Sequence, residues 1–348
     1  MPFTVQELEN ISNAAIDYHF KRGDVLSQTI QEKPLLSKMR QKSKPFPGGK
    51  EKITRRVKGL YTTTIQGYEH DDTVTYANPA NIREASYPWK LIHSGIKFTE
   101  HELLKDGISV VDSTTGKNTV KHDAREMTVL ANLLEDKLED MQEGTDRGMN
   151  DMYWRNGSQD SKVIPGLLSF ILDDPTSATV VGGVDQSLNS WWRNRANVAL
   201  SGVSTLDDQV VLTKLQSEFR QLRRYGGRPD TMLAGSDMME QIEKELRHKG
   251  NYTDTGWANK GQIDGSLADI AFKGIMIHYD PTLDDLSREK YLYVLDCRRI
   301  YPMHINGEEA KKHAPARPAD KYVFYRAITH AGGLVCDQRN CHGVYAFS

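Results

Sequence analysis

The chain has 348 residues, enough for about two domains of roughly 150 residues each. Lys and Arg number 45 and Asp and Glu number 47, so the formal net charge is −2. This balance excludes a protein whose main task is electrostatic binding of nucleic acid. The longest apolar stretch, Ile164–Leu172, is far shorter than the roughly 18 residues of a membrane span. The first residues have no secretory-signal pattern, so no membrane partner is expected.

Three cysteines, Cys297, Cys336 and Cys341, are too few for a disulfide framework and fit a reducing cytoplasm. Cys336 and Cys341 lie close to His342, but a fourth ligand is missing and the spacing is not that of a zinc site. The favoured interpretation is small residues near a late strand, with no metal and no cofactor.

The N-terminal part begins with apolar residues at helical spacing, which predicts a helix over Thr4–Lys21. The composition then becomes basic between Lys38 and Lys58, where Glu51 is the only acidic residue. Prolines and glycines in the middle of this segment predict that no regular core element starts there.

The basic segment has three interpretations. It could bind nucleic acid, but such sites usually interleave aromatic residues, and Phe46 is the only one here. It could be a solvated, flexible arm. The favoured interpretation is pairing with an acidic surface of another subunit. The candidate contact residues are Lys50, Lys52, Arg55, Arg56 and Lys58.

Residues Ile53–Tyr76 are rich in β-formers but mostly polar, and Gly67–Asp72 reads as a turn. This pattern predicts two polar strands that form a ribbon. An isolated ribbon is only marginally stable in water, so it needs the rest of the chain or another copy to lie on. We expect that deleting Lys50–Tyr76 leaves the monomer folded but blocks stable assembly with other copies.

A strand is predicted near Leu91–Phe98 and a short helix at Glu100–Lys105. A long helix follows from Asp123, where a capping-box-like start precedes an apolar stripe. Its other face is acidic and includes Glu135, Asp136 and Glu139. A solvated face is the simplest interpretation of these acids, and they are also the candidate partner of the basic segment.

Residues 157–202 contain Gly, Ser and Pro at short intervals, and this composition predicts loops. Trp191 and Trp192 lie in this region, and we expect one ring to cap the core and the other to face a neighbouring subunit. Helices and strands then alternate. Helices are predicted from Ser204 to Gly226 and from Ser236, and strands at Thr231–Ala234, Phe272–Tyr279, Lys290–Cys297, Tyr322–Ile328 and Val344–Phe347, with a polar linker at Asn306–Pro318.

Motifs for catalysis are missing from the sequence. It contains no phosphate-binding glycine loop, no dinucleotide fingerprint and no HExxH pattern, and Ser236 lacks the second glycine of a nucleophile elbow. We therefore expect a protein that is not an enzyme and has no catalytic residues.

The order of these parts resembles the major capsid proteins of tailed bacteriophages, which share the Hong Kong 97-type fold. Several local stretches resemble a run found in one subgroup of this family. These stretches are Trp154–Gly157, Ile164–Ile171, Thr179–Gly183, Ser190–Asn194, Gly226–Leu233, Phe272–Ile275 and Asp280–Pro281.

The resemblance implies an α+β fold with four parts. They are an N-terminal arm (1–44), an extended β-hairpin loop (45–90) over an adjacent subunit, a peripheral domain (91–162 and 317–348) with a spine helix at about 123–153, and an axial α/β domain (163–316). It also implies a virion structural protein, made in the host cytoplasm, that self-assembles as hexamers and pentamers into an icosahedral head shell.

The partners implied are other copies of the chain, a scaffolding protein, a portal, a decoration protein in some relatives, and packaged double-stranded DNA bound without sequence specificity. Two alternatives stay open at this point. One is an encapsulin-like compartment shell that stores a cargo enzyme, and the other is a nucleic-acid-binding module.

Overall fold

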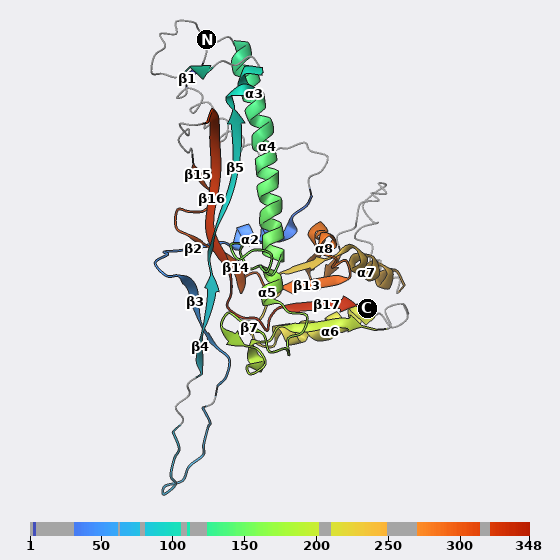
Figure 1. The fold of residues 1–348 in the computed structure, drawn as a ribbon. Helices are drawn as coiled ribbons and strands as arrows, with labels where there is room; N and C mark the ends of the chain where they lie inside the picture. The colour runs from blue at the N-terminus through green and yellow to red at the C-terminus, as the bar shows by residue number, and fades with distance from the viewer. Residues whose placement is uncertain are drawn as a thin grey trace. The chain divides into compact units, whose positions relative to one another are not determined.

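The computed structural model describes residues 3–4, 31–61, 63–76, 81–105, 110–111, 124–201, 210–248, 270–313 and 321–348. The chain forms two compact units (Figure 1). The first contains residues 1–31, 91–149 and 305–331, and the second contains residues 32–90, 150–304 and 332–348. Apart from Thr4, which lies in β1 (Phe3–Thr4), the helix expected over Thr4–Lys21 lies outside the described residues, as does the cap expected at Ser204.

A six-stranded mixed sheet forms the centre of the second unit, in the order β11-β12-β10-β13-β17-β9. Strand β10 pairs with β12 in parallel and with β13 antiparallel, and β17 pairs with β9 in parallel. The strands are β9 (Arg195–Leu200), β10 (Thr231–Ala234), β11 (Ala271–Phe272), β12 (Ile275–Tyr279), β13 (Tyr291–Leu295) and β17 (Gly343–Phe347). Strand β9 was not expected, because the sequence around it reads as a loop.

Two amphipathic helices supply much of the core against this sheet. Helix α6 (Val210–Arg223) and helix α7 (Ser236–His248) carry their apolar residues at helical spacing. In α6 Val211, Leu215 and Leu222 are at most 2% exposed, and they join one cluster with residues of β10, β12 and β13. The periodicity of the sequence predicted both helices.

A hairpin of β3 (Lys52–Lys58) and β4 (Ile82–Pro88) also belongs to the second unit. Ile53 and Val57 of β3 and Tyr87 of β4 are buried. The strand bounds predicted for the ribbon are wrong, since no strand lies within 63–76. The predicted turn is present, because the Asp72 N–H donates to the Glu69 carbonyl at 3.1 Å. Deleting Lys50–Tyr76 would also remove the core residues of β3, so that expectation is wrong for the monomer.

The basic segment, Lys38–Lys58, is folded into the second unit and is not a flexible arm. Helix α2 (Pro34–Lys42) buries Leu35, Leu36 and Met39 to 2% exposure or less, and the Leu36 N–H donates to Asn150 Oδ1 at 3.1 Å. Strand β2 (Lys44–Phe46) follows at once and lies beside β14 (Ile300–Ile305). The prediction that no regular core element starts there is wrong, because β2 and β3 (Lys52–Lys58) both begin inside the segment and bury Phe46, Ile53 and Val57.

The remaining elements of the second unit include the end of a long helix, α4 (Ala124–Trp154). The Trp154 indole N–H donates to Asp280 Oδ2 at 2.9 Å, and burial raises the pKa of Asp280. The short elements are α5 (Leu167–Phe170), β7 (Val180–Val181), β8 (Val184–Asp185), a 3₁₀ turn (Ser190–Trp192) and α8 (Pro281–Asp285). The later half of β16 (Val323–Cys336) pairs with β14 here.

The first unit contains the rest of α4, up to Met149. Leu138 and Met141 on α4 are buried against Ile96 and Ile328. These partners lie on β5 (Lys90–Thr99) and on the first half of β16, which also pairs with β15 (Lys311–His313). The unit also holds α3 (Glu100–Lys105) and a pair of short parallel strands, β1 (Phe3–Thr4) and β6 (Val110–Val111).

The turn between β16 and β17 buries the residues first considered for a metal site. Burial raises the pKa of the Cys297 and Cys336 thiols to about 12 and holds the pKa of Cys341 above its ordinary value. These thiols are therefore protonated at neutral pH. Among the described residues, no group of His, Cys, Asp and Glu side chains has the geometry to hold a metal ion.

His342 should make the protein sensitive to mild acid. It is fully buried, its Nδ1 accepts the Asp296 N–H at 3.2 Å, and burial lowers its pKa from 6.5 to about 4. Between these two values the unfolded chain binds a proton that the folded chain excludes. The free energy of unfolding therefore falls as the pH drops through this window, by about 2–3 kcal/mol at pH 4.5.

The measurement is urea unfolding at pH 7 and pH 4.5 for the parent and for His342→Asn, whose side-chain oxygen can still accept the Asp296 N–H. The substitution should remove this part of the pH dependence. An equal loss of stability in parent and variant would contradict the prediction.

Candidate functional site: a basic cleft at the root of the hairpin

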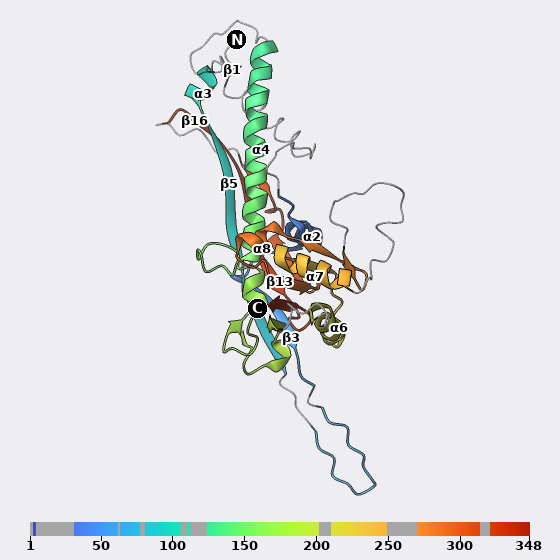
Figure 2. The ribbon, with the colours of Figure 1, turned by 90° about the vertical axis from the view of Figure 1, so that its right-hand side faces the viewer.

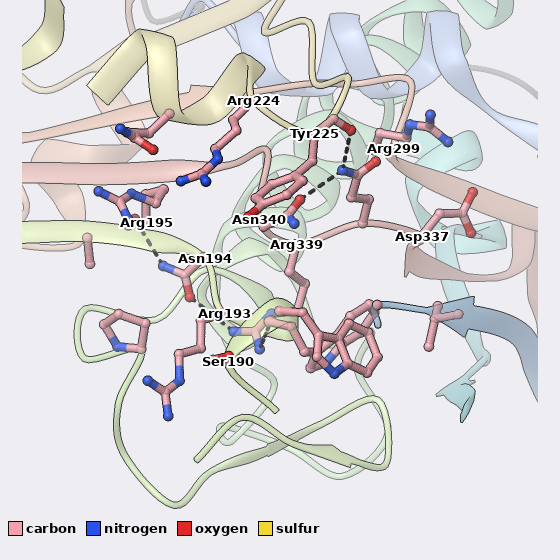
Figure 3. Close-up of a pocket in the computed structure, with 18 of the residues that line it drawn as sticks. Ser190, Arg193, Asn194, Arg195, Arg224, Tyr225, Arg299, Asp337, Arg339 and Asn340 are labelled. Atoms are coloured by element: carbon pink, nitrogen blue, oxygen red, sulfur yellow. Dashed lines mark hydrogen bonds between the residues drawn. The ribbon is translucent and has the colours of Figure 1, made fainter. Parts of the chain in front are cut away.

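A cleft of about 870 Å³ opens in the second unit where the β3–β4 hairpin begins. Its walls come from segments far apart in the sequence. They are the hairpin root (57–61), the stretch around the 3₁₀ turn (190–196), the exposed side of α6 (214–225), Arg299 and the β16–β17 turn (337–340). Figure 3 shows the arginines from these segments placed around the opening.

The charged residues of the lining are mostly basic. Two of its residues, Glu218 and Asp337, are acidic. The basic residues that line it are Lys58, Arg193, Arg195, Lys214, Arg224, Arg299 and Arg339. The excess of positive charge makes the cleft a place for an anionic group.

The two carboxylates are already engaged. Arg195 contacts Glu218 through two hydrogen bonds of 2.8 and 3.0 Å, and Lys214 lies 3.2 Å from the same carboxylate. These contacts hold the pKa of Glu218 below its ordinary value although burial opposes them. Asp337 accepts the Tyr301 hydroxyl at 2.8 Å and lies 3.4 Å from Arg55. Neither carboxylate is left to neutralise the other cations.

Arg339 forms the floor of the cleft and is 1% exposed. Its guanidinium donates to the Phe170 carbonyl (2.7 Å), the Trp192 carbonyl (3.0 Å), Gln186 Oε1 (two contacts of 3.1 Å) and Asn194 Oδ1 (3.1 Å). Burial lowers its pKa to about 10, so it remains charged at neutral pH. It fixes the segment that presents Trp191 and Arg193.

Trp191 supports the hairpin root. Its ring makes an edge contact with Trp192 at 5.7 Å between centroids, and Trp192 is buried with its indole N–H donating to the Val181 carbonyl at 3.0 Å. The backbone of Gly59 lies directly on the Trp191 ring, because a Cβ there would be 1.8 Å from Cδ2. Trp192 is thus the ring that lies in the core, whereas Trp191 lies against Gly59 of its own chain, and its contact with a neighbouring subunit stays a prediction.

Gly59→Ala should therefore displace either Trp191 or the hairpin root, at a cost of about 1–3 kcal/mol from overpacking. Chemical denaturation and the tryptophan emission spectrum would report both changes. Gly67→Ala, at a position where an added Cβ meets nothing within 4 Å, is the matched control. Equal stability of the two variants would show that the root tolerates a side chain.

The predicted contact residues are only partly brought together. Lys58 lines the cleft. Lys50, Lys52 and Arg56 are exposed, and Arg55 donates to the Tyr301 hydroxyl at 2.8 Å within its own chain. Glu139 is half-buried on α4, whereas the side chains of Glu135 and Asp136 lie outside the described residues. Their contact with another subunit stays a prediction.

None of the helices in the described ranges is long and apolar enough to cross a bilayer.

Sequence reasoning missed Arg193, Arg224, Arg299 and Arg339. They are isolated in the sequence and are brought together only by the fold. No local pattern marks them.

No family model matches the chain, and no curated protein matches its sequence. Among solved structures it is similar to a chain of the cyanophage A-1(L) capsid asymmetric unit, with a TM-score of 0.62, 15% identity, and coverage of 94% of this chain and 96% of that one. It is also similar to the capsid of Myoviridae phage XM1 (TM-score 0.52, 9% identity, coverage 93% and 95%). The capsid of a native GTA particle gives a TM-score of 0.51 at 12% identity, covering 94% and 96%.

The chain thus has the mixed helix-and-strand fold of the phage capsid chains in these structures, over nearly its whole length. The fold class expected from the sequence is confirmed.

Proposed function

We propose that this protein is a major capsid protein of a tailed bacteriophage, which self-assembles as hexamers and pentamers into the icosahedral head shell. Its role is structural rather than enzymatic. The shared fold supports this function, since two of the similar structures are phage capsids. The head would enclose double-stranded DNA held without sequence specificity, and the chain would be made in the host cytoplasm and end in the virion.

The observation that carries the proposal is the loop between β3 and β4. Residues 63–76 are exposed throughout, including Ile65 at 101%, Tyr76 at 92% and Tyr68 at 73% exposure. Figures 1 and 2 both show this loop projecting from the hairpin with no other segment of the second unit beside it. Apolar surface displayed in this way is typical of a contact with another molecule.

The domain assignment follows from the same proposal. Residues 1–44 would be the N-terminal arm, 45–90 the loop over an adjacent subunit, 91–162 with 317–348 the peripheral domain, and 163–316 the axial domain. The two compact units divide the chain differently at its C-terminal end, since residues 332–348 belong to the second unit and β17 pairs there with β9 and β13. A scaffolding protein, a portal and, in some heads, a decoration protein would be further partners.

Electron microscopy and sedimentation of the purified full chain test the function, with a candidate scaffolding protein co-expressed where the chain alone does not assemble. We expect rings or closed shells. A chain that stays monomeric in every condition would overturn the proposal, and shells filled with a protein cargo instead of DNA would favour the compartment alternative.

A further inference from the structure

The cleft holds cations that the chain itself does not neutralise. Glu218 is paired with Arg195 and Lys214, and Asp337 lies beside Arg55. In the described part of the chain, no carboxylate lies within ion-pair distance of the other cleft cations Lys58, Arg193, Arg224 and Arg299. Arg193 is also held by the Gln186 and Ser187 carbonyls, at 2.7 Å each, and its charge acts on Asp174 and Asp185. The like charges of Lys58, Arg224 and Arg299 around one opening repel one another, so an acidic group from outside would be stabilised there.

The tip of the hairpin loop has the opposite charge. Residues 59–81 contain Glu69, Asp71 and Asp72 but no Lys or Arg, so every full charge of the loop is negative and lies at its turn. The turn is ordered by its own hydrogen bonds, because the Glu69 N–H donates to Asp72 Oδ2 at 2.9 Å. Gln66 joins the two arms behind the tip, where its side chain accepts the Thr75 N–H at 3.2 Å. The carboxylates are exposed and have no cationic partner among the described residues.

We propose that this acidic tip docks into the basic cleft of a neighbouring copy of the chain. The inference rests on the proposed shell function and names the two surfaces that meet. A chain does not fill its own cleft in this conformation, because the hairpin root lines that cleft and the loop projects away from it, with its tip about 11 residues beyond the root (Figures 1 and 2). The occupant is therefore another molecule.

This contact joins two different surfaces of the same chain. Each copy gives its tip to one neighbour and receives a tip from another, which is the head-to-tail arrangement that closes into rings. Arginine forks can bind a carboxylate through two parallel hydrogen bonds, so Arg224 and Arg299 would orient the tip as well as attract it. Tyr225, 63% exposed on the rim, offers apolar surface to the exposed Tyr68 of the incoming tip.

Charge reversal tests the proposal in the full chain. The tip variant carries Glu69→Lys and Asp71→Lys and leaves Asp72 to hold the turn, and the cleft variant carries Arg224→Glu and Arg299→Glu. Each should lower the yield of shells at least tenfold, and the chain that carries all four changes should regain most of the parent yield. The matched control is Arg220→Glu with Arg228→Glu, two exposed arginines outside the cleft, which should assemble like the parent.

A cross-link gives a second readout. A chain with Asp71→Cys and Arg224→Cys should form disulfide-linked oligomers under mild oxidation, whereas Asp71→Cys with Arg220→Cys should not. The three native thiols are buried and do not interfere.

The outcomes separate this inference from the proposed function. A parent that never assembles overturns both. A parent that assembles as well as both reversal variants, with no cross-link, overturns the tip-to-cleft contact alone. Loss of assembly in the cleft variant, with the tip variant unaffected and no rescue in the combined chain, also overturns it and indicates another anion, such as nucleic-acid phosphate.

Discussion

Replacing Ile65, Tyr68 and Tyr76 by serine should abolish stable shells while leaving the monomer as stable as its parent. These side chains are 101%, 73% and 92% exposed, so the folded monomer gains nothing from them. In an assembled shell each would be covered by a neighbour. Burying a large apolar side chain is worth about 1.5–3 kcal/mol, so the three together would contribute roughly 5–9 kcal/mol to each contact.

Even a third of that value, about 1.7–3 kcal/mol, changes an association constant by about 15- to 150-fold. Because every copy in a shell repeats the contact, the loss recurs at each interface. The measurement is the sedimentable fraction at fixed concentration, with thermal unfolding of the unassembled chain beside it. The control replaces Thr63, Thr64 and Thr73 of the same loop by serine, which removes almost no apolar surface. Shells of the triple-serine variant with the parent's yield and heat resistance would contradict the proposed role of the loop.

The sequence predicted elements whose apolar residues repeat along one face. Helices α4, α6 and α7 were found in this way. Strands β10 and β13 are buried on both faces and were predicted from short apolar runs instead. The prediction from sequence failed where the apolar run is short or interrupted by charged residues. In α2, Leu35, Leu36 and Met39 are buried between basic residues, so the charge of the segment concealed a core helix.

Strand β14 was missed for another reason. It is buried on both faces over Ile300–His304 and contains Pro302, so it shows neither alternation nor the composition of a typical strand. The cleft was beyond sequence reasoning altogether. Arg193 and Arg299 come from loops more than a hundred residues apart in the sequence, and only the fold places both at one opening. The sequence did predict the turn at Gly67–Asp72. The negative charge of this turn indicates a binding partner only once the fold has shown the basic cleft.

Arg339→Ala should be among the most destabilising single substitutions in the second unit, at about 3–5 kcal/mol. The side chain is 1% exposed and its acceptors are all neutral oxygens of segment 170–194. Alanine would take this donor from the Phe170 and Trp192 carbonyls and from Gln186 Oε1, and each buried acceptor left without a donor costs about 1–3 kcal/mol. Asn194 would be affected less, since its Oδ1 still accepts the Leu172 N–H at 3.2 Å and its side chain still donates to the Leu172 carbonyl at 2.8 Å.

Lysine should restore only a minor part of this stability, because one ammonium cannot reproduce the planar fork that reaches Phe170, Gln186, Trp192 and Asn194 together. Urea unfolding measures the change, and limited proteolysis between residues 172 and 194 should show the released segment. Arg220→Ala, at an exposed position on α6, is the control and should change stability by less than about 0.5 kcal/mol. An Arg339→Ala chain within about 1 kcal/mol of its parent would mean that water replaces the guanidinium in that pocket. Since this segment presents Trp191 and Arg193 to the cleft, the variant should also lose shell assembly at temperatures where it is still folded.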